Sequence, residues 1–121
     1  MTNTQLVLRF IDGWNRMDWD TVIGLLADDV VYDNIPMETI YGKAAATVFI
    51  TQGMELDAVN WEVLSIAENG NKVLTERIDN FELSNGKTLS MPVMGTFEIE
   101  NGEIKAWRYY FALATFTPQM A

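Results

Sequence analysis

Three Asn-Gly dipeptides divide the second half of this 121-residue chain: Asn69-Gly70, Asn85-Gly86 and Asn101-Gly102 are each 16 residues apart. The segments around them, from about Val59 onward, are rich in β-branched and aromatic residues. Asn-Gly between alternating runs is the strongest short-range signal of a β-hairpin, because both residues tolerate the positive φ angles of tight hairpin turns. The second half is therefore predicted to form a four-stranded antiparallel meander. The segments share no other pattern, which argues against an internal repeat.

The first half of the chain shows helical periodicity. Apolar residues recur every three or four positions from Leu6 to Trp14 and again from Trp19 to Leu26, where Asp18 is the expected N-cap. Residues 30–34 alternate as a strand, which a proline two positions later stops. An Ala-rich segment from Lys43 to about Met54 is predicted to form a third helix. Three helices and a meander indicate an α+β fold.

The length and composition limit the possible classes of protein. Residues 1–121 are expected to form one domain, and 49% of them are hydrophobic. No apolar run is long enough to span a membrane. A net charge of -9 with only eight Lys and Arg argues against nucleic acid as a partner. The N-terminal residues do not resemble a secretory signal, so a cytoplasmic location is expected. With no Cys and no His, disulfides, Ser-His-Asp triads and ordinary zinc sites are excluded, and we expect no cofactor and no metal.

Arg77 and Asp79 interrupt an otherwise apolar strand face. Side chains alternate along a strand, so the odd-numbered residues of the predicted strand at 73–83 share one face. The ends of that face are apolar and its middle carries the two charges. Burying charge is costly unless it is paired. The pair is therefore expected either to hold the structure together or to take part in chemistry, and the sequence alone leaves both roles open.

The parity of the meander constrains which side chains meet. The apolar faces of the last two strands, near 89–99 and from Lys105 to Leu113, are also odd-numbered, whereas a two-residue turn at 85–86 or 101–102 would pair odd with even residues. Both hairpins are therefore predicted to contain a bulge, with a three-residue loop and Gly in the left-handed conformation. If the two bulges are alike, Arg77 and Tyr109 face the same central residue. We then expect Arg77, Asp79 and Tyr109 to form one cluster.

Several segments together resemble the limonene-1,2-epoxide hydrolase family. The segments that carry the resemblance are Gly13-Trp14-Asn15, Asp28 to Pro36, Tyr41-Gly42-Lys43, Thr75 to Asp79, Pro92 to Glu98 and Trp107 to Phe111. The resemblance implies a cone-shaped, curved antiparallel sheet wrapped by about three N-terminal helices, as in the superfamily of nuclear transport factor 2, ketosteroid isomerase and scytalone dehydratase. It also implies a homodimer formed between sheet faces, where Leu74, Ile78 and Ile104 would leave apolar groups exposed.

The resemblance also implies roles for individual residues. Tyr32 and Asn34 match a Tyr and an Asn that hold a water, and Arg77 and Asp79 match an Arg-x-Asp pair whose Asp acts as the general acid toward the epoxide oxygen. The family's second Asp, which takes the proton of the water, is replaced here by Tyr109. With a single carboxylate beside Arg77, Asp79 is expected to be an anion more often, and so a better base. A tyrosine is a poor base at neutral pH but a good hydrogen-bond donor.

These residues are compatible with three functions. The leading hypothesis is epoxide opening of a small apolar molecule, with Asp79 as base and Tyr109 as proton donor. The second is a proton transfer next to a carbonyl, as in ketosteroid isomerase, with Asp79 as base and Tyr32 or Tyr109 as donor. The third is a non-catalytic domain that binds an apolar ligand. In each case the expected lining residues are Phe81, Met91, Val93, Trp107 and Phe111.

Overall fold

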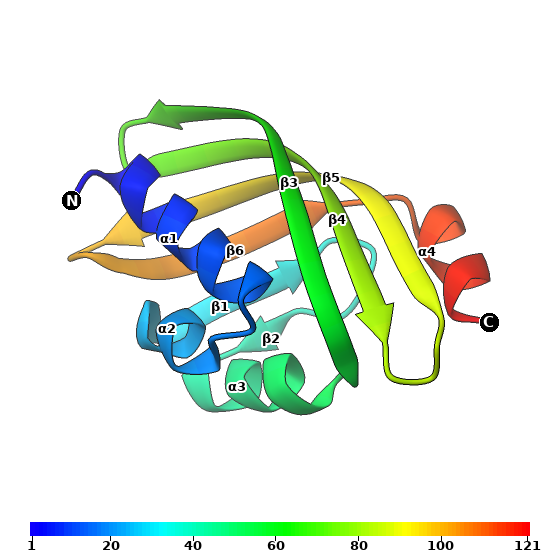
Figure 1. The fold of residues 1–121 in the computed structure, drawn as a ribbon. Coiled ribbons are helices and arrows are strands. Elements are labelled where there is room, and N and C mark those ends of the chain that lie inside the picture. Colours follow the sequence, from blue (N-terminus) through cyan, green and yellow to red (C-terminus); the bar gives the residue numbers. More distant parts are fainter.

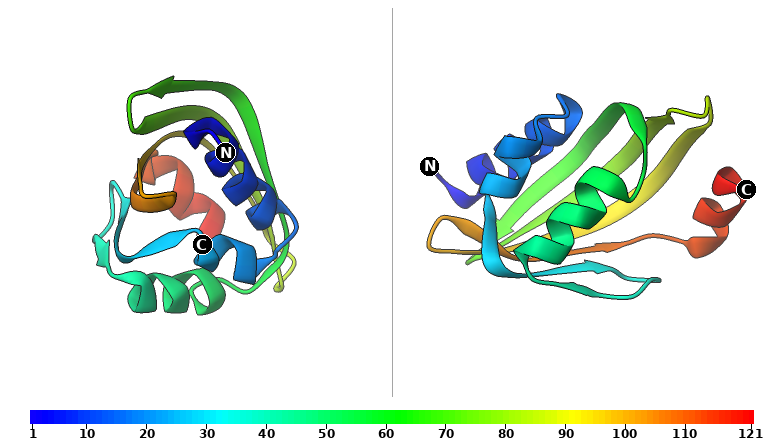
Figure 2. Two further views of the ribbon diagram at one scale, coloured as in Figure 1. Left: turned by 90° about the vertical axis from the view of Figure 1, so that its left-hand side faces the viewer. Right: turned by 90° about the horizontal axis from the view of Figure 1, so that it is seen from below.

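The structure, a computed structural model that describes residues 1–121, is built on one six-stranded sheet in the order β2-β1-β6-β5-β4-β3 (Figure 1). The helices are α1 (Asn3–Asn15), α2 (Trp19–Gly24), α3 (Lys43–Gln52) and α4 (Leu113–Met120). The strands are β1 (Leu26–Asn34), β2 (Ile40–Tyr41), β3 (Leu56–Asn69), β4 (Lys72–Leu83), β5 (Thr88–Glu100) and β6 (Glu103–Tyr110). The sheet curls around the N-terminal helices without closing (Figure 2), which confirms the predicted α+β fold class.

The meander β3-β4-β5-β6 is antiparallel throughout, as predicted. Three features differ from the sequence expectation. Strand β1 pairs in parallel with β6, so the sheet is mixed, and the short strand β2 pairs with β1. The last strand ends at Tyr110, and Leu113 begins helix α4, which the sequence analysis did not predict. No helix in the fold combines the length and the apolar composition that a bilayer crossing requires.

The two bulges of the meander are unlike. Between β4 and β5 a loop over residues 84–86 is closed by a hydrogen bond from the Leu83 amide to the Lys87 carbonyl, with Gly86 at a φ of 87°, as predicted. Between β5 and β6 the turn has only two residues, Asn101 and Gly102, at φ angles of 54° and 74°. The extra residue lies inside β6, since Glu98 pairs with Ala106 but Ile99 pairs with Ile104.

This difference moves the register of β6 by two residues. Arg77 pairs with Val93, whereas Tyr109 pairs with Gly95, so the expectation that they face the same residue was wrong. The bulge within β6 also reverses the alternation beyond it. Ile104, expected on the outer face, is therefore fully buried. Leu74 is exposed and Ile78 is half-buried, as an outer face requires.

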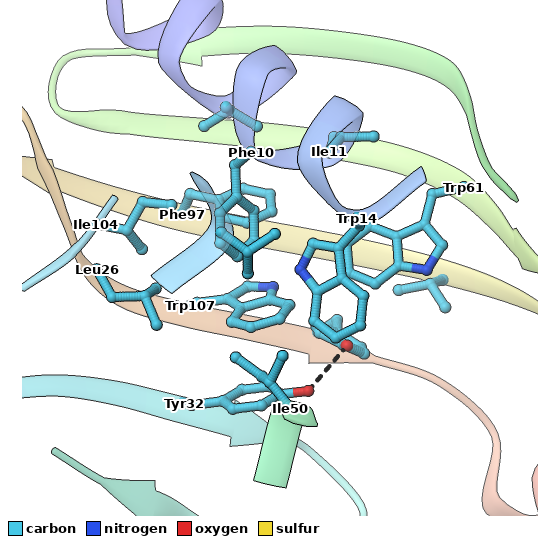
Figure 3. Packing of buried hydrophobic residues seen from close by; sticks show 14 of the residues in the cluster. Phe10, Ile11, Trp14, Leu26, Tyr32, Ile50, Trp61, Phe97, Ile104 and Trp107 are labelled. Atoms are coloured by element: carbon cyan, nitrogen blue, oxygen red, sulfur yellow. Dashed lines mark hydrogen bonds between the residues drawn. The ribbon is translucent and has the colours of Figure 1, made fainter. Parts of the chain in front are cut away.

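The core is an aromatic stack between α1 and the sheet (Figure 3). The indole of Trp107 lies between two rings that are nearly parallel to it: Tyr32 at 4.0 Å and Phe97 at 6.1 Å between centroids. Phe10 from α1 meets Trp107 edge-on at 4.9 Å. Offset and edge-on packing are the preferred arrangements of aromatic pairs. The stack fixes the part of β6 that precedes Tyr109.

The Gly13-Trp14-Asn15 segment joins α1 to the edge of the sheet. A side chain at Gly13 would lie 3.1 Å from a methyl group of Val22, so the glycine allows α2 to pack closely. Trp14 stacks on Trp61 of β3 at 4.6 Å. The Asn15 side chain accepts a 2.7 Å hydrogen bond from the Trp61 amide and donates one of 3.2 Å to its carbonyl. Because β3 is an edge strand, Asn15 satisfies backbone groups that have no neighbouring strand.

Candidate active site

Arg77 and Asp79 form a fully buried, bidentate ion pair on the inner face of β4. Nε of Arg77 donates to one carboxylate oxygen at 2.9 Å and Nη2 donates to the other at 3.0 Å. Both residues are 0% exposed. Alternation along β4 places them on the same side as Thr75 and Phe81, as the sequence predicted. A fork of two parallel hydrogen bonds is the strongest pairing that these side chains form.

The remaining side of the guanidinium is enclosed by a hydroxyl and three aromatic rings. Nη1 of Arg77 donates to Oγ1 of Thr75 at 2.8 Å. Cζ lies 4.7 Å from the ring centre of Trp61, 5.3 Å from that of Tyr109 and 5.8 Å from that of Phe97. Cation–π contacts stabilise a desolvated cation. The predicted cluster of Arg77, Asp79 and Tyr109 is thus present, with Tyr109 in contact through its ring face.

Tyr32 and Tyr109 bring two hydroxyl groups together beside this ion pair. Their oxygens are 3.1 Å apart, and the hydrogen bond is the dashed line that ends at Tyr32 in Figure 3. Tyr32 lies on β1 and Tyr109 on β6, whose parallel pairing sets Asn34 opposite Tyr109. Asn34 is buried next to Tyr32 at the end of β1. The structure therefore brings Tyr32, Asn34 and Tyr109 into one group.

Burial changes the pKa values of the ionisable groups of the site. Burial raises the pKa of Tyr32 to about 12, although hydrogen bonding with Tyr109 and Asn34 opposes the rise. Burial, with the charges of Tyr32 and Asp79, raises the pKa of Tyr109 well above its usual value. Both phenols are therefore neutral donors at physiological pH. Burial also raises the pKa of Asp79, although the bidentate contact with Arg77 opposes the rise, so the carboxylate binds a proton more tightly than expected from its pairing with Arg77 alone.

An apolar cavity of about 190 Å³ lies against the two tyrosines. Its lining residues come from both halves of the chain and are mostly aromatic or Met: Tyr32, Asn34, Met37, Phe49, Gly53, Met54, Phe81, Leu89, Met91, Tyr109, Phe111, Phe116 and Met120. Helix α4 contributes the last two of these side chains. Its Gln119 binds both the amide and the carbonyl of Ser90, at 2.7 and 3.0 Å. This double hydrogen bond holds α4 on β5 beyond the end of β6.

The predicted site residues do not all reach the cavity. Phe81, Met91 and Phe111 line it, as expected. Val93 and Trp107 do not: Val93 is buried opposite Arg77, and Trp107 is fully enclosed in the aromatic stack. Asp79 does not line it either, but Met91, its partner on β5, does. The carboxylate thus lies behind the cavity wall.

Several cavity residues were missed by the sequence analysis. The predicted lining residues all came from the meander, whereas Met37 lies between β1 and β2, Phe49 lies on α3, and Phe116 and Met120 lie on α4. The spacing of Phe116 and Met120, four residues apart, is a helical signal that could have located α4. Pro118 between them obscures it. No three acidic side chains converge in the fold to form a metal site.

Comparison with known proteins assigns the chain to a family. The family model of the limonene-1,2-epoxide hydrolase catalytic domain matches residues 1–121. The chain belongs to the limonene-1,2-epoxide hydrolase family. This family member is 30% identical to the epoxide hydrolase EphG of Mycobacterium tuberculosis over 102 residues, which are 84% of this chain and 68% of EphG.

Solved structures with the same fold include proteins inside and outside this family. An LEH-like epoxide hydrolase of M. tuberculosis superposes with a TM-score of 0.85 at 28% identity, covering 97% of this chain and 87% of that one. A SnoaL-like protein from Shewanella denitrificans superposes with a TM-score of 0.87 over 98% of this chain and 96% of that one, at 14% identity. The second likeness shows a shared fold only.

Proposed function

We propose that this member of the epoxide hydrolase family opens the ring of a small apolar epoxide by adding water. The oxygen of the water attacks one ring carbon while the bond from that carbon to the ring oxygen breaks. Asp79 takes a proton from the water, and Tyr109 donates its proton to the ring oxygen. A diol leaves, and the proton on Asp79 returns to the Tyr109 phenolate. The observation that supports this most is the pair of neutral phenols at the cavity wall beside the Arg77–Asp79 pair.

The tyrosine pair is suited to donate one proton. Each hydroxyl has one O–H, so only one of Tyr32 and Tyr109 can donate across the 3.1 Å contact. The other receives that hydrogen bond and keeps its own proton for the substrate. Accepting a hydrogen bond polarises a hydroxyl and makes it a stronger donor. In the proposed arrangement Tyr32 donates to Tyr109, and Tyr109 donates to the epoxide oxygen.

Asp79 is suited to act as the base although it lies behind the cavity wall. Each of its oxygens accepts one bond from Arg77 and keeps a further lone pair for a water. The neighbouring positions on its face of the sheet, Phe81 and Met91, both line the cavity. A water held by Tyr32 and Asn34 would have to reach the carboxylate between these side chains. The raised pKa of Asp79 makes its anion a stronger base.

The cavity supports a small substrate. Its volume of about 190 Å³ is below the roughly 300–1,000 Å³ of typical ligand sites. A small alicyclic epoxide such as limonene oxide is a suitable probe, whereas a steroid would require the cavity to expand.

Incubation with limonene oxide, followed by chromatography of the diol, tests this proposal. Diol should form above the buffer rate, and Asp79→Asn and Tyr109→Phe should each lower turnover on the order of 10²- to 10⁴-fold. Tyr110→Phe is the matched control, because Tyr110 is the next residue on β6 and is 49% exposed. If wild type and Asp79→Asn form diol at the same rate as buffer, the hydrolase proposal is wrong.

A second candidate function is non-catalytic binding of an apolar ligand. The position of Asp79 behind the cavity wall, with both oxygens bound by Arg77, favours it. In that case limonene oxide should bind, as measured by calorimetry, without being consumed. A proton transfer next to a carbonyl, as in ketosteroid isomerase, would use the same base, Asp79, and the same tyrosine donors. Conversion of a small cyclic enone without conversion of epoxides would support it instead.

We also propose that the protein is a homodimer. Leu64, Leu74, Met94 and Tyr110 are exposed on the outer face of the meander, and a second copy would cover these apolar groups. Light scattering should give twice the mass of the chain, and Met94→Glu should shift it toward the monomer. A monomeric wild type at micromolar concentration would contradict this.

A further inference from the structure

Gly95 lies at the centre of a row of three residues that crosses the sheet. It pairs with Thr75 on β4 and with Tyr109 on β6. A Cβ atom built on Gly95 would lie 2.4 Å from Nη1 and 3.3 Å from Cζ of Arg77. The guanidinium therefore occupies the space where a side chain at position 95 would lie. The φ angle of Gly95 is outside the left-handed region, so space, and not backbone conformation, is what requires a glycine here.

This space explains how Arg77 reaches Tyr109 despite the shifted register. The residue opposite Arg77 on β5 is Val93, which lies two residues along the strand from Gly95, the partner of Tyr109. The arginine side chain leans from its own row over Gly95, which brings Cζ to 5.3 Å from the Tyr109 ring centre. Any larger residue at 95 would push the guanidinium away from this position.

Thr75 fixes the guanidinium in that space. Its hydroxyl lies 3.3 Å from the Gly95 carbonyl oxygen, to which it donates, and it accepts the 2.8 Å hydrogen bond from Nη1 of Arg77. A hydroxyl has one proton, and because this proton is used on the carbonyl, the lone pairs of the oxygen are left for Arg77. With Nη1 held, Nε and Nη2 face the two oxygens of Asp79.

We propose that Gly95 and Thr75 are positioning residues, which hold the Arg77 guanidinium between Asp79 and Tyr109. Neither touches the proposed substrate, and both act through Arg77. Their effect on catalysis rests on the proposed function, whereas their effect on the Arg77–Asp79 contact does not. A misplacement of about 1 Å in an active site can cost on the order of 10²-fold in rate.

Three variants and a matched control test this proposal. Gly95→Ala inserts a methyl group against Nη1, Thr75→Val removes the hydroxyl at nearly constant volume, and Thr75→Ser keeps the hydroxyl. Gly24→Ala is the control, because a Cβ on Gly24 meets nothing within 4 Å. The first readout is the titration of the Asp79 carboxyl carbon by NMR, which needs no turnover. The second is the pH profile of diol formation.

Gly95→Ala and Thr75→Val should raise the Asp79 titration midpoint, since weaker contact with Arg77 removes a charge that lowers it. Both should lower turnover on the order of 10²-fold and move the acidic limb of the pH profile upward. Thr75→Ser and Gly24→Ala should resemble wild type. If Gly95→Ala fails to fold while Gly24→Ala folds, the steric conflict is supported, and the Thr75 pair then tests positioning.

An Asp79 titration that is unchanged in Thr75→Val would overturn the positioning role, whatever the activity. If wild type forms no diol but Asp79 titrates as expected in the variants, the proposed function fails and the positioning proposal stands.

Discussion

The hydroxyl oxygens of Tyr32 and Tyr109, on strands that are far apart in the sequence, lie 3.1 Å apart at the wall of the apolar cavity. The contact exists because β1 inserts in parallel beside β6, which aligns the end of β1 with the end of β6. One of the two phenols must donate to the other, so the pair presents a single free proton to the cavity. Most of the chemistry proposed for this protein depends on that proton and on the nearby carboxylate.

The tyrosine pair should make the protein sensitive to alkali. Because the folded-state pKa values of Tyr32 and Tyr109 are raised, their contribution to stability is complete below the unfolded value of about 10. It is lost as the pH rises through the folded values, about 12 for Tyr32. Between pH 10 and the folded pKa of each group, the free energy of unfolding should fall by about 1.4 kcal/mol per pH unit for that group. Urea unfolding at several alkaline pH values should show a shallower slope for Tyr32→Phe than for wild type, with Tyr41→Phe, on an exposed side chain, as control.

Tyr109→Asp should increase epoxide hydrolysis. The change puts a carboxylate where the resembled family has its base, within reach of Arg77. The new carboxylate would act as the base, and Asp79 would replace the lost phenol as the proton donor, the role that the resemblance implies for it. A positioned base typically contributes about 10²- to 10⁴-fold, so a rise of at least tenfold in diol formation is expected. Loss of the buried ring should also lower stability by about 3 kcal/mol or more. Tyr110→Asp is the control on the outer face. A folded Tyr109→Asp protein with no gain in rate would mean that the site does not use the family's arrangement.

Arg77→Met should destabilise the protein strongly. Removing one partner of a buried ion pair leaves the other charge uncompensated, which typically costs about 3–5 kcal/mol. Asp79 should then bind a proton more readily, so the variant should lose stability as the pH rises above the acidic range. Arg16→Met is the matched control, because the Arg16–Asp12 pair is 56% and 62% exposed and exposed pairs contribute little. Urea unfolding midpoints of both variants and of wild type should be measured at pH 5 and pH 8. If Arg77→Met and Arg16→Met lose the same amount of stability relative to wild type, the prediction is contradicted.

Phe116→Ala should change substrate preference. Its ring lines the cavity from α4, and its removal should enlarge the space for longer substituents on the epoxide. KM should fall for longer alkyl epoxides relative to limonene oxide, with a smaller change in kcat, because Phe116 lines the cavity but makes none of the hydrogen bonds of Arg77 or of the two tyrosines. Leu113→Ala, on the same helix but outside the lining, is the control. If the ratio of KM for longer alkyl epoxides to KM for limonene oxide is the same in Phe116→Ala as in wild type, α4 does not limit substrate size.

The alternation of residues 73–83 was enough to predict that Arg77 and Asp79 share the inner face with Phe81. It could not decide whether the pair would reach a cavity, since that depends on side chains from other elements. The structure places Phe81 and Met91 at the cavity and Asp79 behind them. The loop at 84–86 was also predictable, because Gly86 adopts the positive φ angle that a bulged hairpin loop requires and that glycine readily adopts.

The amino-acid sequence by itself determined the antiparallel meander, the positions of its Asn-Gly turns, the odd-numbered inner face of β4 and the family, because alternation, turn residues and short motifs are local properties of the chain. Only the tertiary structure decided that Tyr109 faces Gly95 and not Val93, that β1 brings Tyr32 to Tyr109, and that α4 contributes to the cavity wall. The bulge in β6 has no local signal, since the Asn101-Gly102 turn is compatible with either register. Its position is set by which side chains can be buried together, and burial is a property of the whole fold.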